Sequence, residues 1–207
     1  MMKKAMSLIL VLALVLVLPV AAMAEEDTFG VGTSEGNSYW NESLKIGCTM
    51  DENWYFYTDE EIMENMQATT DMLKEDLAEA VKEAGTMMDM MAANMETGDN
   101  VNVNLERLSV ANALLFTEDK YLELSMTQLG DALEQMGLEN VKLEKDEMEF
   151  MGEKHPCIHL TGSIEGIDLF ETLVAVKTGR TMIVITACSY FEDVTADILS
   201  SFYNEKP

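Results

Sequence analysis

Three side chains that can bind a transition metal follow one another at intervals of two residues, at His155, Cys157 and His159. In a strand, residues two apart point to the same face, and imidazole and thiolate are good ligands for zinc or copper. Such neighbours are about 7 Å apart along the strand, however, so three of them do not easily reach one tetrahedral ion. We therefore interpret them as ordinary strand residues and keep a zinc or copper site as the alternative.

A second group of metal-binding side chains is the methionine cluster Met87, Met88, Met90 and Met91. Thioethers are soft ligands that select copper(I). The chain contains 18 methionines, and others recur at helical positions, which is typical of methionine used as a general apolar filler. We therefore expect no cofactor, and an extracytoplasmic metal-binding protein is the alternative.

No motif in the sequence indicates catalysis. The stretch 162–166 lacks the spacing of a nucleophile elbow. The glycine-rich stretch 30–36 has no predicted strand before it and no helix after it, as a phosphate-binding loop requires. The chain's two histidines stand in no sequence context for a Ser or Cys triad. We predict that the protein is not an enzyme, and we assign no catalytic or cofactor-binding residue.

The three cysteines, Cys48, Cys157 and Cys188, each lie in an apolar segment that resembles a strand. A small buried hydrophobic residue is the usual role of such a cysteine. Outside the cytoplasm, an odd number allows one disulfide with a spare thiol, or three free thiols. The sequence leaves these two alternatives open.

The N-terminus has the three parts of a secretory signal peptide. Lys3 and Lys4 form a basic start, residues 8–18 are an unbroken apolar run, and Ala22-Met-Ala24 provides a small-x-small cleavage pattern. The run is shorter than the roughly 20 apolar residues that span a membrane. We predict that residues 1–24 are removed before Glu25, that the protein is secreted, and that it does not insert into a membrane after cleavage.

The charge of the mature chain limits its partners. Removal of Lys3 and Lys4 leaves 11 basic residues against 38 acidic ones, a net charge of −27. Such a surface repels nucleic acid and anionic lipid headgroups. Cationic partners and metal ions are favoured in principle, although solubility alone accounts for the charge. We therefore expect no nucleic-acid partner.

The pattern of apolar residues defines the elements that position these groups. It predicts strands over 44–50, 54–57, 101–105, 141–145, 148–151, 155–163, 167–177 and 181–189. It also predicts one long or two short helices over 59–83, and helices over 118–136 and 194–202. A capping box of Thr58 and Glu61 marks the first helix start. Residues 87–95 fit either a hairpin partner or a continuing helix. We read the acidic segment 25–37 as a flexible linker and 38–207 as one domain.

Asparagines at 100, 102 and 104 and Glu106 would line the polar face of the strand around 101–105. This is not a calcium loop, because the glycine and the closing bidentate glutamate of such a loop are missing at the required positions. We predict that this polar face is exposed to solvent.

Two segments set the predicted architecture. Residues 173–176 and 182–188 show little polar alternation, so we expect their strands to be covered on both faces. The connections are too short for parallel crossovers. We predict an α+β fold, an α/β/α sandwich in which an antiparallel central sheet carries helices on both faces.

The element order and three motifs resemble the PsbP-like family, in particular uncharacterised exported proteins of Gram-positive anaerobes. The motifs are Trp54-x-Phe56-Tyr57-Thr58, Gly152-x-x-x-Pro156, and Ile183-x-Ile185-Thr186 followed by Asp193 and Phe202. The resemblance implies this sandwich and a non-catalytic role, but no transferable site. We therefore expect a secreted, monomeric binding or accessory domain that acts on an unknown protein or cell-envelope partner.

Overall fold

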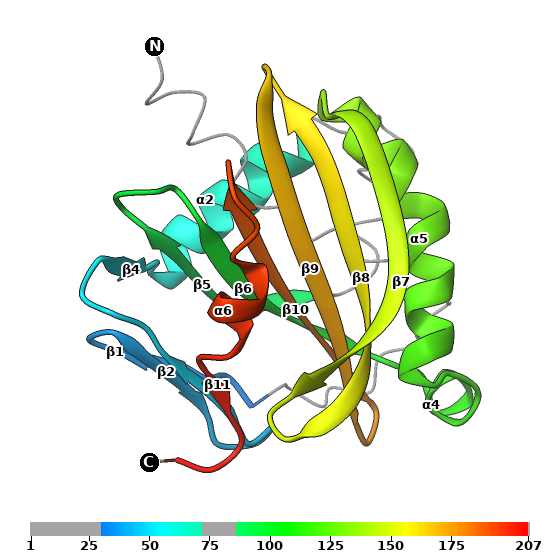
Figure 1. The fold of residues 1–207 in the computed structure, drawn as a ribbon. Coiled ribbons are helices and arrows are strands. Elements are labelled where there is room, and N and C mark those ends of the chain that lie inside the picture. The colour runs from blue at the N-terminus through cyan, green and yellow to red at the C-terminus, as the bar shows by residue number, and fades with distance from the viewer. Residues whose placement is uncertain (1–29, 72–85, 207) are drawn as a thin grey trace.

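The computed structural model describes residues 30–71 and 86–206, which form two sheets and a few helices (Figure 1). In the larger sheet seven strands lie in the order β4-β5-β6-β10-β9-β8-β7, and in the smaller one the order is β1-β2-β3-β11. Every recorded strand pair is antiparallel. The fold is therefore α+β with antiparallel sheets, as predicted.

The elements follow the predicted order closely. The strands are β1 (Thr33–Glu35), β2 (Ser38–Asn41), β3 (Ile46–Thr49), β4 (Trp54–Phe56), β5 (Met87–Asn94), β6 (Asn100–Arg107), β7 (Glu139–Phe150), β8 (Glu153–Ile164), β9 (Ile167–Thr178), β10 (Thr181–Tyr190) and β11 (Phe202–Tyr203). The helices are α2 (Asp59–Thr70), α4 (Val110–Leu115), α5 (Glu118–Gln135) and α6 (Thr195–Leu199). Residues 87–94 are thus a strand, the first of the two alternatives for that segment.

Local sequence explains where the helices begin. Thr58 accepts a hydrogen bond from the Glu61 amide while the Glu61 carboxylate accepts from the Thr58 amide, so the predicted capping box starts α2. Thr117 caps α5 by accepting from the Lys120 amide. The predicted helix over 194–202 is shorter, because α6 ends at Leu199 and Phe202 begins β11.

One face of the large sheet packs against α5. The buried stripe Leu122, Leu129 and Leu133 lies on apolar side chains of the long strands, such as Leu160 and Leu173. Helix α2 packs on the same side farther along, where Ile62 contacts Met88, Met91 and Ala93 of β5. Apolar burial of this kind contributes about 25 cal/mol per Å² and is the main stabilising term.

The opposite face of the large sheet is covered by the small sheet together with α6. Tyr39, Cys48 and Phe202 from the small sheet pack with Val103 and Ile185 of the large one. Figure 1 shows α6 and the small sheet on one side and α2 and α5 on the other. The central strands are therefore covered on both faces, as predicted. On this second face, however, the cover is a sheet and a five-residue helix, and not the layer of helices that the sequence analysis predicts.

Several predictions concern the N-terminal part of the chain and the first helix. The predicted signal peptide, residues 1–24, lies outside the described residues. The part of the predicted helix 59–83 that follows Asp71 also lies outside them. Residues 33–35, within the predicted linker, form strand β1 and pair with β2. Among residues 30–71 and 86–206, no helix has the length and apolar character needed to cross a membrane.

Candidate functional site

The two histidines have different partners. His155 Nδ1 lies 3.1 Å from the Glu118 carboxylate, whose second oxygen accepts the Lys177 amide at 2.7 Å. Pairing of β8 with β9 is recorded only as far as Cys157 and Val174, so Glu118 accepts from an amide beyond the part of β9 that pairs with β8. His155 therefore belongs to a contact that joins the start of α5 to β8 and β9.

His159 contacts Cys157 instead. The thiol sulfur lies 3.5 Å from His159 Nε2, and His159 Nδ1 lies 3.0 Å from Thr172 Oγ1. This resembles a nucleophile and base pair, but burial raises the pKa of the Cys157 thiol to about 11. Reactive thiols have a lowered pKa and partial exposure, whereas Cys157 is 0% exposed. The geometry keeps this thiol protonated at neutral pH.

The candidate methionine ligands do not come together. The 87–91 segment contains a bulge between Met88 and Met90, and Met90 faces the small sheet while Met88 and Met91 face α2. Met87 is partly buried and packs with the small-sheet side. Within the described part of the chain, no group of three or more His, Cys, Asp or Glu side chains could hold a metal ion.

The bulge instead delivers a buried carboxylate. Asp89, the extra residue of β5, accepts hydrogen bonds from the Gly32 amide at 2.9 Å, from Asn41 Nδ2 at 2.7 Å and from the Tyr39 hydroxyl. All three donors belong to β2 or to the segment that leads into β1. Asp89 thus connects β5 of the large sheet to the small sheet.

The three cysteines are free thiols. Cys48 and Cys157 belong to the core between the two sheets, and Cys188 belongs to the core under α5. Of the two alternatives left by the sequence, the structure contains the one with three free thiols.

A row of buried polar side chains lies on the helix-bearing face of the large sheet, between the apolar contacts of α2 and those of α5. We call this row the polar strip; its members are Asn100, Asn102 and Asn104 of β6, Thr186, Cys188 and Tyr190 of β10, and Glu171 of β9. Cys188 stands directly opposite both Asn100 and Glu171, and Thr186 stands opposite Asn102. All members except Tyr190 are at most 4% exposed.

The position of the asparagines corrects the sequence prediction. The face formed by Asn100, Asn102, Asn104 and Glu106 was predicted to be exposed to solvent, yet all four are buried. Their cross-strand neighbours on β5 are Ala93, Met91 and Met88, which pack under α2. The polar face is therefore enclosed between two apolar clusters.

Within the described part of the chain, five polar atoms of the strip have no nitrogen or oxygen hydrogen-bond partner, although the Cys188 thiol contacts the side chains of Glu171, Asn100 and Tyr190. They are Glu171 Oε2, Asn100 Nδ2, Thr186 Oγ1, Asn104 Oδ1 and Tyr190 OH. Leaving one buried polar atom unsatisfied costs about 1–3 kcal/mol, so native proteins contain few of them. Here five occur on neighbouring positions of three adjacent strands. The strip is therefore a concentrated polar surface in which a thiol, a weak hydrogen-bonding group, is the partner that several of these side chains share.

Burial also raises the pKa of two members of the strip, Glu171 and Cys188, and of the neighbouring Glu106. It raises the pKa of Glu171 to about 8, which a contact with the Cys188 thiol lowers only in part. It raises the pKa of Glu106 to about 7, although the Tyr121 hydroxyl donates to that carboxylate at 2.6 Å. Burial first, and then the charge of Glu171, raise the pKa of the Cys188 thiol. At neutral pH, Glu171 is mostly protonated and uncharged.

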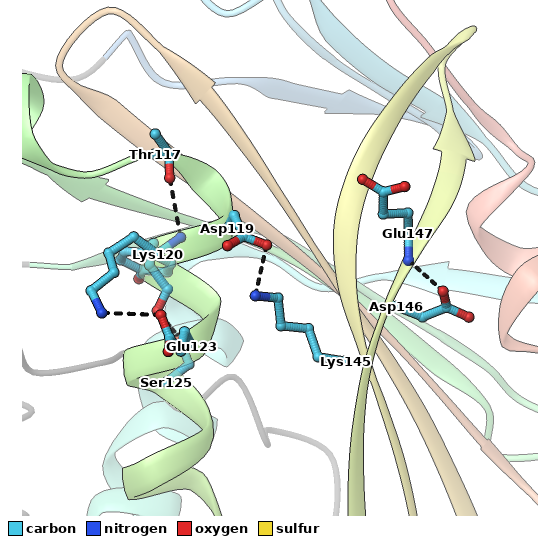
Figure 2. Close-up of polar contacts among 9 residues, drawn as sticks. Thr117, Asp119, Lys120, Glu123, Ser125, Lys145, Asp146 and Glu147 are labelled. Atoms are coloured by element: carbon cyan, nitrogen blue, oxygen red, sulfur yellow. Dashed lines mark hydrogen bonds and ion pairs between the residues drawn. The ribbon is translucent and has the colours of Figure 1, made fainter.

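A shallow hollow of about 330 Å³ lies at the start of α5 and is lined by Thr117, Glu118, Asp119, Glu147, Pro156 and Lys177. Three of its four charged lining residues, Glu118, Asp119 and Lys177, have partners in the protein. Figure 2 shows Asp119 and Lys145 pointing toward each other across the space between α5 and β7, with 2.7 Å between their charged atoms. The Lys177 ammonium donates to the carbonyls of Ala113 and Phe116. The hollow therefore lacks the unsatisfied groups that distinguish the polar strip.

Comparison with known proteins identifies no family. No protein-family profile and no characterised protein sequence matches the chain. One similar structure is that of a Bacteroides thetaiotaomicron protein, with 9% sequence identity and a TM-score of 0.44. The similarity covers 84% of the present chain but only 50% of the Bacteroides protein. Another is LpqN of Mycobacterium tuberculosis, involved in cell envelope biogenesis, with 10% identity, a TM-score of 0.39 and 75% coverage of each chain. A Pseudomonas aeruginosa protein of unknown function, PA94, has 15% identity and a TM-score of 0.27 over 44% of this chain and 58% of its own.

Proposed function

We propose that the protein is a secreted, non-enzymatic binding protein that holds a small polar ligand in the polar strip. The observation that carries this proposal is the set of five unpartnered, closely spaced polar atoms. We also propose, on the sequence resemblance, a PsbP-like sandwich in which a small sheet shares the cover of one face. A binding or accessory role agrees with that resemblance.

The energetics favour a ligand over an empty strip. Each unsatisfied buried group destabilises the empty protein by roughly 1–3 kcal/mol, and a ligand that completes its hydrogen bonds recovers part of that energy on binding. Once the free ligand concentration exceeds Kd, the free energy of unfolding increases with the logarithm of that concentration. Because the strip is enclosed, ligand exchange requires local opening of the covering elements.

One observation favours zinc or copper binding as a second candidate function. Cys157 Sγ and His159 Nε2 lie 3.5 Å apart, so they provide two ligands that could contact one ion. The remaining ligands would come from a partner or from the bound molecule. Stoichiometric zinc or copper in the secreted protein, lost in a His159→Ala variant, would support this alternative.

The test of the main proposal starts from the mature protein purified from the medium of its native host. We expect mass spectrometry of the denatured protein to release a small polar molecule at near-stoichiometric amount. The variant Thr186→Val keeps the side-chain shape but removes one unpartnered hydroxyl, and we expect it to retain less of that molecule. The matched control is Thr161→Val, the same replacement at an exposed position of β8. A protein that carries only water, and that no small polar molecule stabilises, would refute the proposal.

A further inference from the structure

Glu171 is the unusual member of the polar strip. It is 2% exposed, and among the described residues its Oε2 atom has no nitrogen or oxygen hydrogen-bond partner. Its cross-strand neighbours on this face are Cys188 and Leu160. A thiol is a weak donor, and leucine is apolar. A buried carboxylate normally requires a cation or several strong donors, and the described side chains around Glu171 supply neither.

The other carboxylates on this face already have partners. Asp99 accepts hydrogen bonds from the Thr97 hydroxyl and from the Tyr190 amide, at 2.6 and 3.1 Å. Glu106 accepts from the Tyr121 hydroxyl. Glu171 is therefore the acid on this face, within the described part of the chain, whose oxygen remains available to a ligand.

The other unpartnered atoms of the strip include both hydrogen-bond acceptors and donors, because a hydroxyl can act as either. Thr186 lies two residues from Cys188 on β10, about 7 Å along the strand, and its Oγ1 atom is unpartnered. Asn104 Oδ1 and the Tyr190 hydroxyl add further oxygens, while Asn100 Nδ2 is the one unpartnered nitrogen donor recorded in the strip. The complementary ligand thus carries a polar group that can meet Thr186 and Asn100, and at Glu171, a buried carboxyl with no cation beside it among the described residues, it brings positive charge.

The surroundings of Glu171 favour a cationic ligand over an anionic one. An anion would meet Glu171 without a nearby cation, because Lys177, on the same face of β9, already donates to two main-chain carbonyls. Across the chain, acidic residues outnumber basic ones by 38 to 13. The resulting potential attracts small cations and raises their local concentration.

From this arrangement, and resting on the proposed function, we propose that the ligand of the polar strip is a small organic amine whose ammonium group pairs with Glu171. The ammonium donates to Glu171 Oε2, and an adjacent polar group of the ligand contacts Thr186 and Asn100. On binding, the carboxyl proton of Glu171 leaves to solvent and the ammonium takes its place. No covalent bond forms or breaks in the ligand.

Three probes of the same length separate the amine from other polar ligands. They are 1,4-diaminobutane, 4-amino-1-butanol and 1,4-butanediol, which carry two, one and no ammonium groups. Binding to the mature protein is measured by titration calorimetry at pH 8. We expect both amines to bind at least about tenfold more tightly than the diol, because a charge-assisted hydrogen bond is roughly twice as strong as a neutral one. Calorimetry in buffers of different ionisation enthalpy should also detect proton release in the fraction of molecules with protonated Glu171.

Glu171→Gln removes the charge but keeps the size of the side chain. We expect this variant to lose at least about tenfold in affinity for the amines and to bind the diol unchanged. The matched control is Glu144→Gln on β7, which changes net charge equally at an exposed position. Equal binding of amine and diol, or unchanged amine binding in Glu171→Gln, would overturn the inference and leave the proposed function intact. If none of the probes binds, the test is the identity of the molecule released from the native protein. A released molecule without an amine would overturn the inference. A native protein that holds no small molecule would refute the proposed function itself.

Discussion

The replacement Glu171→Gln should make the protein more stable, by an amount that depends on pH. Burial raises the pKa of Glu171 from its ordinary value of 4.5 to about 8 in the folded protein. The titratable groups near it are Cys188, Tyr190 and Asp99, and burial raises the pKa of the first two so that they stay neutral. No basic group contributes to the shift of Glu171.

The sign follows from proton binding in the two states. The folded protein keeps the Glu171 proton over a pH range in which the unfolded chain has lost it. The stability associated with protonated Glu171 is therefore fully present below pH 4.5 and is lost as the pH rises through about 8. A shift of this size corresponds to roughly 5 kcal/mol at the end of that range, and to roughly 3 kcal/mol at pH 7.

The assay is urea unfolding of wild type and Glu171→Gln from pH 5 to pH 9. Glutamine does not titrate, and the Glu106 contribution cancels in the difference between the two proteins. We expect a small difference at pH 5 that grows in favour of the variant up to about pH 8, by roughly 2–4 kcal/mol. The exposed replacement Glu144→Gln should give a flat difference. A difference for Glu171→Gln that does not vary with pH, or one that favours wild type at high pH, would refute the burial argument.

Three other predictions concern the remainder of the fold. Asp89→Ala removes the acceptor of three hydrogen bonds, from Gly32, Tyr39 and Asn41. Urea unfolding should therefore show a free energy of unfolding lower by roughly 2–4 kcal/mol, whereas Glu35→Ala, at an exposed position, should change it little. Leu129→Ala, in the core under α5, should lower stability by roughly 2–5 kcal/mol, while Leu114→Ala, at a residue that is 83% exposed, should change it by about 0.5 kcal/mol or less. A thiol reagent should modify no cysteine in the native protein and all three after denaturation, because each thiol is buried.

The regular elements were largely predictable because their signals are local. The capping box at Thr58 and Glu61 and the apolar stripe of 118–136 fixed the starts of α2 and α5 to within a residue. The unbroken apolar runs 173–176 and 182–188 correctly indicated strands covered on both faces. What covers a strand is a long-range property, so the sequence did not reveal that β11 and the N-terminal strands form a second sheet.

The metal hypothesis depended on whether side chains converge, which spacing alone does not decide. The bulge at Asp89 sends neighbouring methionines to opposite faces of β5, and no local signal marks it. The contact between Cys157 and His159 was within reach of the two-residue period, whereas the bond from His155 to Glu118 joins positions 37 residues apart.

The polar strip shows why polarity along a strand does not by itself indicate solvent. The alternation at 100–106 indicates that one face of the strand is polar and the other apolar. A strand face exposed to water and one that binds a buried polar ligand have the same sequence pattern. The distinguishing information lies in β5, where Met88, Met91 and Ala93 continue the same face as an apolar surface under α2. A polar row between two apolar clusters, with Glu171 at its far side and five atoms lacking partners, is energetically unfavourable unless another group completes it. The features that the sequence interpretation assigned to solvent are therefore those that carry the proposed binding site.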